Sequence, residues 1–225
     1  LEDHEGYYQA RDIYRRLLEN EPQSTVLKLR LGCVESKLGH NEAAVELLFE
    51  VLDEQDTNWE AHAQLGEALK KLSRTEEAIQ HFRKAEEHSE EIPVAYTKTV
   101  ITHIWVLSNN NRLEEVVRLY DRARLIIPHS ALLHRAMGEI FEDFGLDDEA
   151  TACYALELEL YKSLIAAKPD NLDYNLRTAE LHNRFGNSQK ALDILDSIDK
   201  RMMSNAHICR LYGDILKNLS RMEEA

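Results

Sequence analysis

The stretch WEAHAQLGEALKKLSRTEEAIQHFRKAEEHSEEI, residues 59–92, decides the fold. It contains two runs in which apolar residues recur at helical spacing, and each run has a small residue at a central apolar position, Gly66 in the first and Ala78 in the second. The bulky Phe82 follows four residues after Ala78. Small residues let two helices approach closely and a bulky one fills the remaining gap, so the stretch predicts a pair of antiparallel helices.

The same pattern returns along the chain with a period of 34 residues, the interval from Gly32 to Gly66 and again from Ala179 to Gly213. Repeats of this length stack into a solenoid in which each copy packs on its neighbours. The small residue of the first helix in each pair is Gly32, Gly66, Gly138, Ala179 or Gly213, and that of the second helix is Ala10, Ala44, Ala78, Ala150 or Ala191.

The pattern resembles the tetratricopeptide repeat, and Trp59, Leu65, Gly66, Ala78, Phe82 and Ala85 form the best copy. The resemblance implies an all-α fold: a right-handed α-solenoid of antiparallel helix pairs, with a concave face lined by the first helix of each pair. We expect one continuous array over residues 1–225 and a fragment of a longer chain. The copies span about 1–24 (partial), 25–58, 59–92, 93–130, 131–171, 172–205 and 206–225 (partial).

Two copies are longer than the rest. Ile104 occupies the glycine position of the third full copy, 38 residues after Gly66, which predicts one extra helical turn near residues 94–108. The fourth should have a second helix running from Asp147 to about Ala167, about two turns longer than usual. The predicted helices span 6–19, 25–38, 42–54, 59–72, 75–88, 94–108, 112–126, 130–144, 147–167, 171–185, 188–203 and 205–219.

The net charge indicates a class of partner, and the cysteine content indicates a location. The net charge of −14, from 27 basic and 41 acidic residues, argues against nucleic acid and anionic lipid and favours a protein or peptide with Lys or Arg. Acidity that merely keeps a long surface soluble is an equal alternative. Three scattered cysteines favour a reducing, cytoplasmic location. No apolar run is long enough for insertion into a membrane.

A search for chemistry finds no glycine-rich phosphate loop and no zinc-binding motif, so we expect no catalytic, cofactor or metal site and no enzyme within this segment. Glu139 could meet His103 or His182 on a neighbouring helix, but an acidic helical protein produces such pairs by chance. Cys33 and Cys209 are expected to be packed thiols rather than nucleophiles.

The residue after each small position of a first helix should point to the concave face. We therefore expect a row rich in carboxylates, flanked by basic residues, with Trp105 as an apolar anchor for a basic segment. An ordinary solvated face is the alternative. Arg135 and Glu139, and also Arg210 and Asp214, should pair within one helix. The candidate partner-binding residues are Glu67, Lys70, Trp105, Arg135, Glu139, Glu142, Glu180, Asn183, Arg210 and Asp214.

One branch of the tetratricopeptide repeat family clamps the terminal carboxylate of heat-shock chaperones with Lys and Asn on successive first helices. The matching positions here hold Leu29 and Cys33, then Ala63 and Glu67. Because Glu67 would repel a carboxylate, we do not expect a chaperone C-terminus as the ligand.

Three functional interpretations stay open. The first is a scaffold or adaptor, and the second is the substrate-recognition module of an enzyme whose catalytic domain lies outside this segment. The third is homo-oligomer formation through exposed terminal repeats, with Leu211, Ile215 and Leu219 as an uncapped apolar face. The long fourth copy adds either a longer packed helix or a docking knob around Lys162, Ser163 and Lys168.

Overall fold

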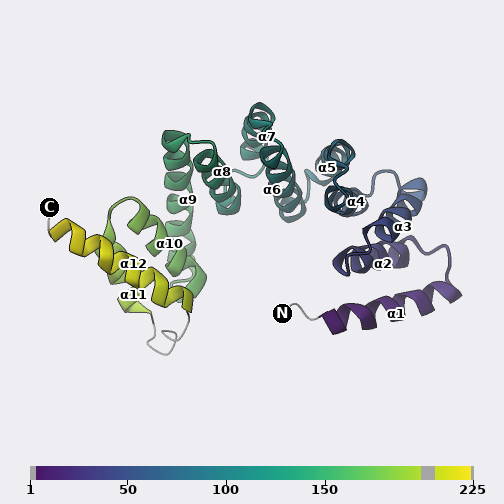
Figure 1. Ribbon diagram of the computed structural model, residues 1–225, viewed down its shortest axis with the longest axis horizontal. Coiled ribbons are helices and arrows are strands. Elements are labelled where there is room, and N and C mark those ends of the chain that lie inside the picture. Colours follow the sequence, from purple (N-terminus) through teal and green to yellow (C-terminus); the bar gives the residue numbers. More distant parts are fainter. Residues whose placement is uncertain (1–3, 199–205, 224–225) are drawn as a thin grey trace. The chain divides into compact units, whose positions relative to one another are not determined.

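The computed structural model describes residues 4–198 and 206–223, and these form twelve helices and no strand (Figure 1). The expected all-α class of paired antiparallel helices is therefore confirmed. The chain divides into two compact units, Leu1–Pro128 and His129–Ala225, and each is described by itself. The prediction of one continuous array across both stays a prediction.

The described residues of the first unit, 4–128, form seven helices, and each packs on the next along the chain. Pairs α2/α3, α4/α5 and α6/α7 are the predicted hairpins, and α1 packs on α2 without a preceding helix among the described residues. The helices are α1 (His4–Asn20), α2 (Thr25–Lys37), α3 (Asn41–Glu54), α4 (Trp59–Lys71), α5 (Thr75–Ser89), α6 (Pro93–Asn109) and α7 (Leu113–Ile126).

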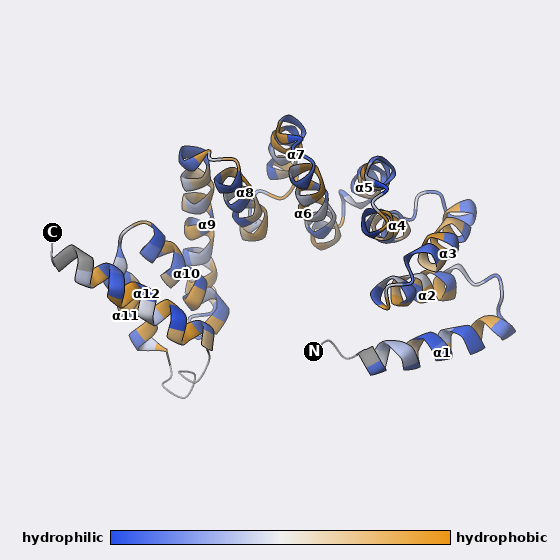
Figure 2. Ribbon diagram, viewed as in Figure 1, coloured by the Kyte–Doolittle hydropathy of each residue, from blue (hydrophilic) through white to orange (hydrophobic). Residues whose placement is uncertain are grey.

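The second unit contains two complete hairpins, α8/α9 and α10/α11, and a further helix that packs on α11. Most helices of both units show hydrophobic and hydrophilic residues on different faces (Figure 2), as expected for helices that bury one side. The helices are α8 (Ala131–Asp143), α9 (Asp147–Ala167), α10 (Leu172–Arg184), α11 (Ser188–Ser197) and α12 (Ala206–Glu223).

In the hairpins α2/α3, α4/α5 and α8/α9 the glycine of the first helix faces a bulky side chain of the second. A methyl group added at Gly66 would lie 2.8 Å from the ring of Phe82, and one added at Gly138 would lie 2.5 Å from the ring of Tyr154. Both aromatic side chains are fully buried. The small-then-large pattern seen in the sequence is thus the actual contact between the paired helices.

The two insertions lie where the sequence placed them. Helix α6 has 17 residues, whereas α2, α4, α8 and α10 have 13 each. Helix α9 has 21 residues and spans the predicted range from Asp147 to Ala167. Its extension is packed, because Tyr161 is buried and its ring lies 5.8 Å from that of Tyr174 on α10. A docking role for the nearby exposed side chains stays a prediction.

Helix α11 is shorter than predicted. The sequence indicated a helix over 188–203, but the backbone of Ile198 is extended and the helix ends at Ser197. Residues 198–205 contain no glycine or proline, which are the residues that usually mark the end of a helix. Nothing in the sequence therefore signals that the helix ends here. The rest of the predicted range, 199–203, lies outside the described residues.

The turn inside each hairpin needs one residue in the left-handed conformation. Gly39 adopts it in the first turn, and Ser73 occupies the matching place in the next, with φ of 61°. In both, the residue that follows donates its backbone N–H to a carbonyl near the end of the first helix, from His40 to Glu35 and from Arg74 to Leu69, each at 2.9 Å. This arrangement satisfies the last carbonyls of the first helix.

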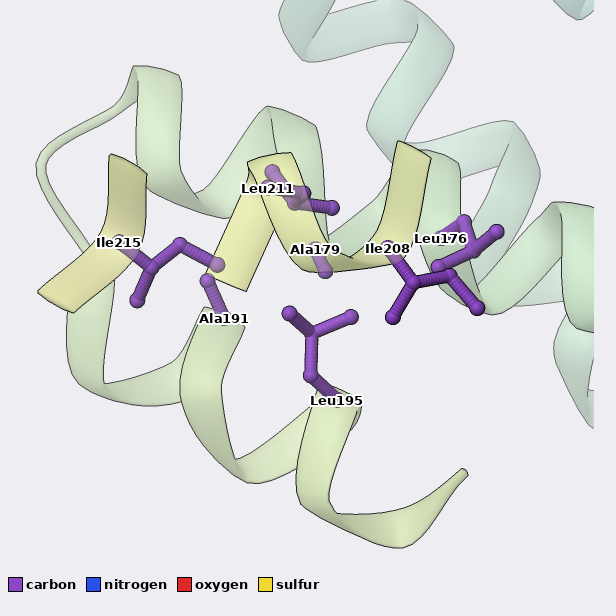
Figure 3. Packing of buried hydrophobic residues seen from close by; sticks show 7 residues of the cluster. All are labelled: Leu176, Ala179, Ala191, Leu195, Ile208, Leu211 and Ile215. Carbon is purple, nitrogen blue, oxygen red and sulfur yellow. The ribbon is translucent and has the colours of Figure 1, made fainter. Parts of the chain in front are cut away.

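The core of the second unit corrects one expectation. Leu211 and Ile215 are buried in one cluster with residues of α10 and α11 (Figure 3). Leu219 is partly buried and packs against the same cluster. These residues are therefore not the uncapped face that the sequence suggested for self-assembly. The exposed side of α12 carries Leu216 instead, which is 45% exposed.

The glycine contacts predict opposite effects of one substitution at two sites. Gly138→Ala should lower the free energy of unfolding by about 1–3 kcal/mol, because the new methyl group overlaps Tyr154. Gly213→Ala should raise it by about 0.5–1 kcal/mol, because no atom lies within 4 Å of its methyl position and alanine favours a helix. Urea denaturation followed by circular dichroism measures both, and equal effects would contradict the packing.

The turn conformation gives a second prediction. Ser73→Gly should stabilise the protein by about 0.5–1 kcal/mol, because glycine adopts positive φ without steric cost. The matched control is Ser163→Gly, an exposed serine inside α9, which should destabilise by a similar amount. Destabilisation by Ser73→Gly in the same denaturation experiment would exclude a strained turn.

Candidate partner-binding surface

A largely apolar pocket of about 350 Å³ lies in the first unit between α4 and α6, the first helices of two successive pairs. Helix α4 contributes Trp59, Ala63 and Glu67, and α6 contributes Lys98 and Thr99 among others. A hollow of this size accepts one large apolar side chain with room for its backbone. Its position on successive first helices is where the sequence predicted the binding face.

The rim of this pocket exposes aliphatic side chains. Val94 is 83% exposed and Ile92 is 45% exposed, and both line the pocket. Sequence reasoning did not identify them, because Ile92 and Pro93 end one pair and begin the next outside the repeating pattern. Exposed aliphatic groups beside an apolar hollow are typical of a surface that binds another molecule.

The predicted residues of the first unit lie partly exposed on the first helices. Glu67 lines the pocket and forms an ion pair with Lys70 at 2.5 Å. Glu60, also on the wall, accepts from Arg30 at 2.6 Å. Trp105 is half-buried. The carboxylates at this face therefore have cationic partners within the protein, which the sequence pattern alone did not indicate.

The predicted residues of the second unit are also mostly paired. Arg135 and Glu139 form the expected ion pair at 2.9 Å, and Glu142 accepts from the Tyr154 hydroxyl at 2.9 Å and from Arg184. The expected pair of Arg210 and Asp214 does not occur in the described part of the chain, where both side chains are exposed. Exposed ion pairs within one helix contribute little to the stability of the protein.

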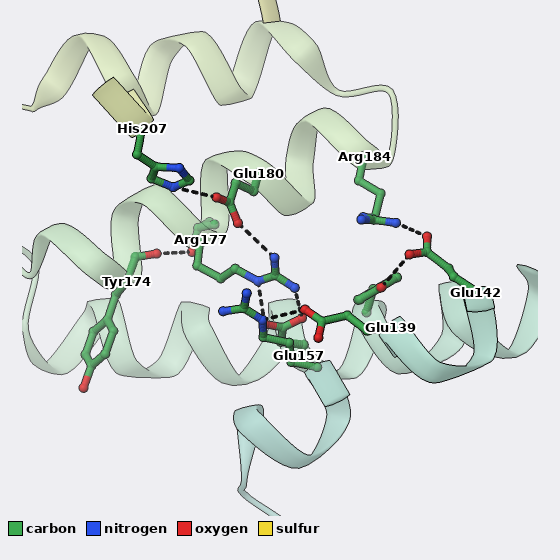
Figure 4. Close-up of polar contacts among 11 residues, drawn as sticks. Glu139, Glu142, Glu157, Tyr174, Arg177, Glu180, Arg184 and His207 are labelled. Carbon is green, nitrogen blue, oxygen red and sulfur yellow. Dashed lines mark hydrogen bonds and ion pairs between the residues drawn. The ribbon is translucent and has the colours of Figure 1, made fainter. Parts of the chain in front are cut away.

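The strongest polar contact of this unit was not predicted. Arg177 donates to both carboxylate oxygens of the fully buried Glu157 at 2.7 and 2.8 Å, and to Glu180 at 2.9 Å (Figure 4). Glu180 also pairs with His207 at 2.9 Å. This network joins α9, α10 and α12. The predicted recognition residue Glu180 therefore helps to hold the unit together.

Asn183 has a similar internal role. Its side-chain oxygen accepts from the Ser188 hydroxyl at 2.9 Å and from the Asn218 amide at 3.1 Å. It therefore connects α10 to α11 and α12. The continuity of the whole predicted row, which spans both units, stays a prediction.

The histidines and cysteines are the candidate metal ligands in the described part of the chain. Among the described residues, no group of three or more His, Cys, Asp or Glu side chains could hold a metal ion. His103 belongs to the first unit and pairs with Glu86 at 2.6 Å, so its suggested contact with Glu139 stays a prediction. In the second unit Glu139 pairs with Arg135, and no contact of His182 with Glu139 is seen among the described residues. Burial raises the pKa of the Cys33 thiol to about 11, consistent with an unreactive thiol. Cys209 is exposed, which contradicts the expectation of a packed thiol.

Two histidines share one hydrogen bond between α4 and α5. The Nδ1 atoms of His62 and His81 are 2.9 Å apart, and Nε2 of His62 lies 2.9 Å from the backbone oxygen of Asp56. Because a carbonyl only accepts, Nε2 of His62 donates, and its Nδ1 accepts from His81 when both rings are neutral. Protonation of His62 would place two N–H groups against each other.

Three comparisons place this fold among known proteins. The tetratricopeptide repeat model matches residues 29–92. The structure resembles the crystal structure of MamA, with 21% identity, a TM-score of 0.60 and coverage of 71% of this chain and 91% of that chain. It also resembles YrrB, described as a TPR protein with an unusual peptide-binding site. The identity is 16%, the TM-score is 0.53, and the match covers 93% of this chain and 97% of that chain. A search of curated proteins returned no match.

A third resemblance is to TTC0263, a thermophilic TPR protein of Thermus thermophilus, with 21% identity, a TM-score of 0.53 and coverage of 86% of this chain and 99% of that chain. The hairpins and their small-to-large contacts define a fold built from helical repeats. Residues 29–92 therefore match the tetratricopeptide repeat model, and the fold of the described residues is that of solved tetratricopeptide repeat proteins. None of the described helices is both long and apolar enough to cross a membrane.

The histidine pair predicts a stability that depends on pH. Burial, with help from His62 and Lys84, lowers the pKa of His81 to about 4, and burial also lowers that of His62. Glu77 partly opposes the shift of His81, and Asp56 that of His62, whereas His88 adds to the latter. Because the folded state favours neutral rings, this stability is complete above pH 6.5 and is lost as the pH falls towards 4.

The measurement is urea denaturation at pH values of about 7.5, 6, 5 and 4, which bracket the ordinary and the lowered pKa. Between pH 6.5 and 4 the free energy of unfolding should fall less in the His81→Gln variant than in the original protein. The difference should be on the order of 1 kcal/mol, since the ring is partly solvated. His129→Gln, at an exposed position, is the control and should leave the profile unchanged. Identical profiles for the two variants would refute the role of the pair.

Proposed function

We propose that this chain is a scaffold or adaptor that binds a partner polypeptide segment on the face formed by its first helices. The single observation that carries the proposal is the apolar pocket between α4 and α6 with Val94 and Ile92 on its rim. A large apolar side chain of the partner fills this pocket and Trp105 adds apolar contact further along α6. A cytoplasmic location belongs to the same proposal.

The net charge of −14 supports a partner with Lys or Arg. The internal pairs of Glu67 and Glu139 reduce the charge available for direct contact. The charge therefore contributes mainly to the rate of association, and burial of the apolar anchor supplies most of the affinity. Binding should weaken only moderately with added salt, because buried apolar contacts are not screened.

The test selects random peptides of about a dozen residues on the 225-residue protein by phage display and measures the affinity of enriched peptides by fluorescence anisotropy. Enriched sequences should share one large apolar residue with an excess of Lys and Arg. The double substitution Ala63→Gln and Val94→Gln should weaken them at least tenfold, because it fills the pocket and removes its apolar rim.

The matched control is the pair Ala155→Gln and Leu125→Gln. Both residues are exposed and lie outside the pocket, and Leu125 is 81% exposed, close to the value for Val94. This control should change affinity less than twofold. Equal affinity of the two double variants, or no enrichment at all, would reject the pocket as the binding site. Enriched peptides without basic residues would reject only the charge preference.

A further inference from the structure

A second pocket in the first unit, of about 280 Å³, lies where α5, α6 and α7 meet. It shares no lining residue with the pocket between α4 and α6. Three arginines line it, Arg83 from α5 and Arg118 and Arg122 from α7, and Leu107 and Leu119 supply apolar surface. The pocket therefore combines cationic groups from two helices with an apolar part.

Each arginine forms an ion pair through one terminal nitrogen. Arg118 pairs with Glu114 at 3.1 Å and Arg122 with Glu90 at 2.6 Å, and neither carboxylate lines the pocket. Arg83 pairs with Glu115 at 2.9 Å. A guanidinium has five N–H groups, so each arginine keeps donors that a bound oxyanion can use without breaking these pairs.

The carboxylates on the wall are mostly engaged. Glu115 accepts from Arg112 at 2.6 Å as well as from Arg83, and Glu86 accepts from Nδ1 of His103 at 2.6 Å. The exposed Glu87 is the lining carboxylate for which no partner is seen within the described residues. Its side chain can rotate into solvent, but its charge opposes an anion and provides a test.

A buried, unpartnered nitrogen gives an independent indication of a ligand. The His103 side chain lines this pocket and is 3% exposed, and its Nε2 has no hydrogen-bond partner in the described protein. A buried polar atom without a hydrogen-bond partner destabilises the protein, and a ligand atom that supplies the partner removes that cost. Because Nδ1 faces Glu86, a hydrogen bond at Nε2 needs a ligand oxygen that shares one proton with the ring, as the P–O–H group of a phosphate monoester can.

We propose that this pocket binds a phosphate monoester, either on a phosphorylated side chain or on a small molecule. A phosphate has three terminal oxygens for the guanidinium groups and His103, and Leu107 and Leu119 contact the carbon group that carries it. The net charge of −14 opposes anions at long range, but salt screens it beyond about 8 Å in physiological buffer, so the local arginines decide.

The experiment titrates the 225-residue protein with inorganic phosphate, phenyl phosphate and a phosphoserine pentapeptide in phosphate-free buffer at constant ionic strength. NMR signals of the arginine Nε–H groups report binding. We expect saturable shifts with phenyl phosphate that sodium chloride and phenol do not reproduce. Saturation by the pentapeptide indicates a phosphorylated polypeptide as the source, whereas saturation by phenyl phosphate alone indicates a small phosphate ester.

Three variants decide between a site and general charge attraction. The double substitution Arg118→Gln and Arg122→Gln should weaken phenyl phosphate at least tenfold, and Glu87→Gln should tighten it two- to fivefold. Arg124→Gln removes one positive charge from the same helix at a position outside the pocket, and it should change the affinity for phenyl phosphate less than twofold. Non-saturable shifts, or equal weakening by the double variant and Arg124→Gln, would overturn the proposal.

Discussion

The contact on which this structure depends is the close approach of two paired helices where one side chain is missing. Gly66 and Gly138 leave room that the rings of Phe82 and Tyr154 fill completely. This contact sets the distance and the rotation of both helices in a pair. The residues that follow each small position are thereby turned away from the second helix, which places Glu67 and Glu139 on a common type of face.

Much of the fold could be predicted because this contact requires small and bulky residues at fixed spacings in the sequence. The extended helix α9 was predicted from Asp147 to Ala167, since acidic residues mark its beginning and Pro169 follows its end. The end of α11 at Ser197 has no such mark, and there the prediction overran. Local signals thus predict an element well only where its ends are chemically marked.

The candidate site was predicted less completely, because its properties arise from contacts between helices. The pairing of Arg177 with Glu157 joins residues 20 positions apart, and no repeat pattern indicates it. The pocket rim at Val94 lies in the link between two pairs, where the repeat imposes no residue type. The periodicity of the sequence predicts which face of a helix a residue lies on. The pairing of charges and the position of a pocket can be seen only once the helices are packed together.

An acidic composition therefore does not by itself produce an acidic binding face. The carboxylates of Glu67, Glu139 and Glu180 each lie beside a cation of the same unit, so the field close to the surface is weaker than the net charge implies. If the two proposed sites bind as we infer, discrimination at short range depends on apolar shape in the α4/α6 pocket and on arginines with unused donors in the second pocket. The two pockets share no lining residue, so the two proposed ligands, an apolar segment and an anion, would occupy separate surfaces of one unit.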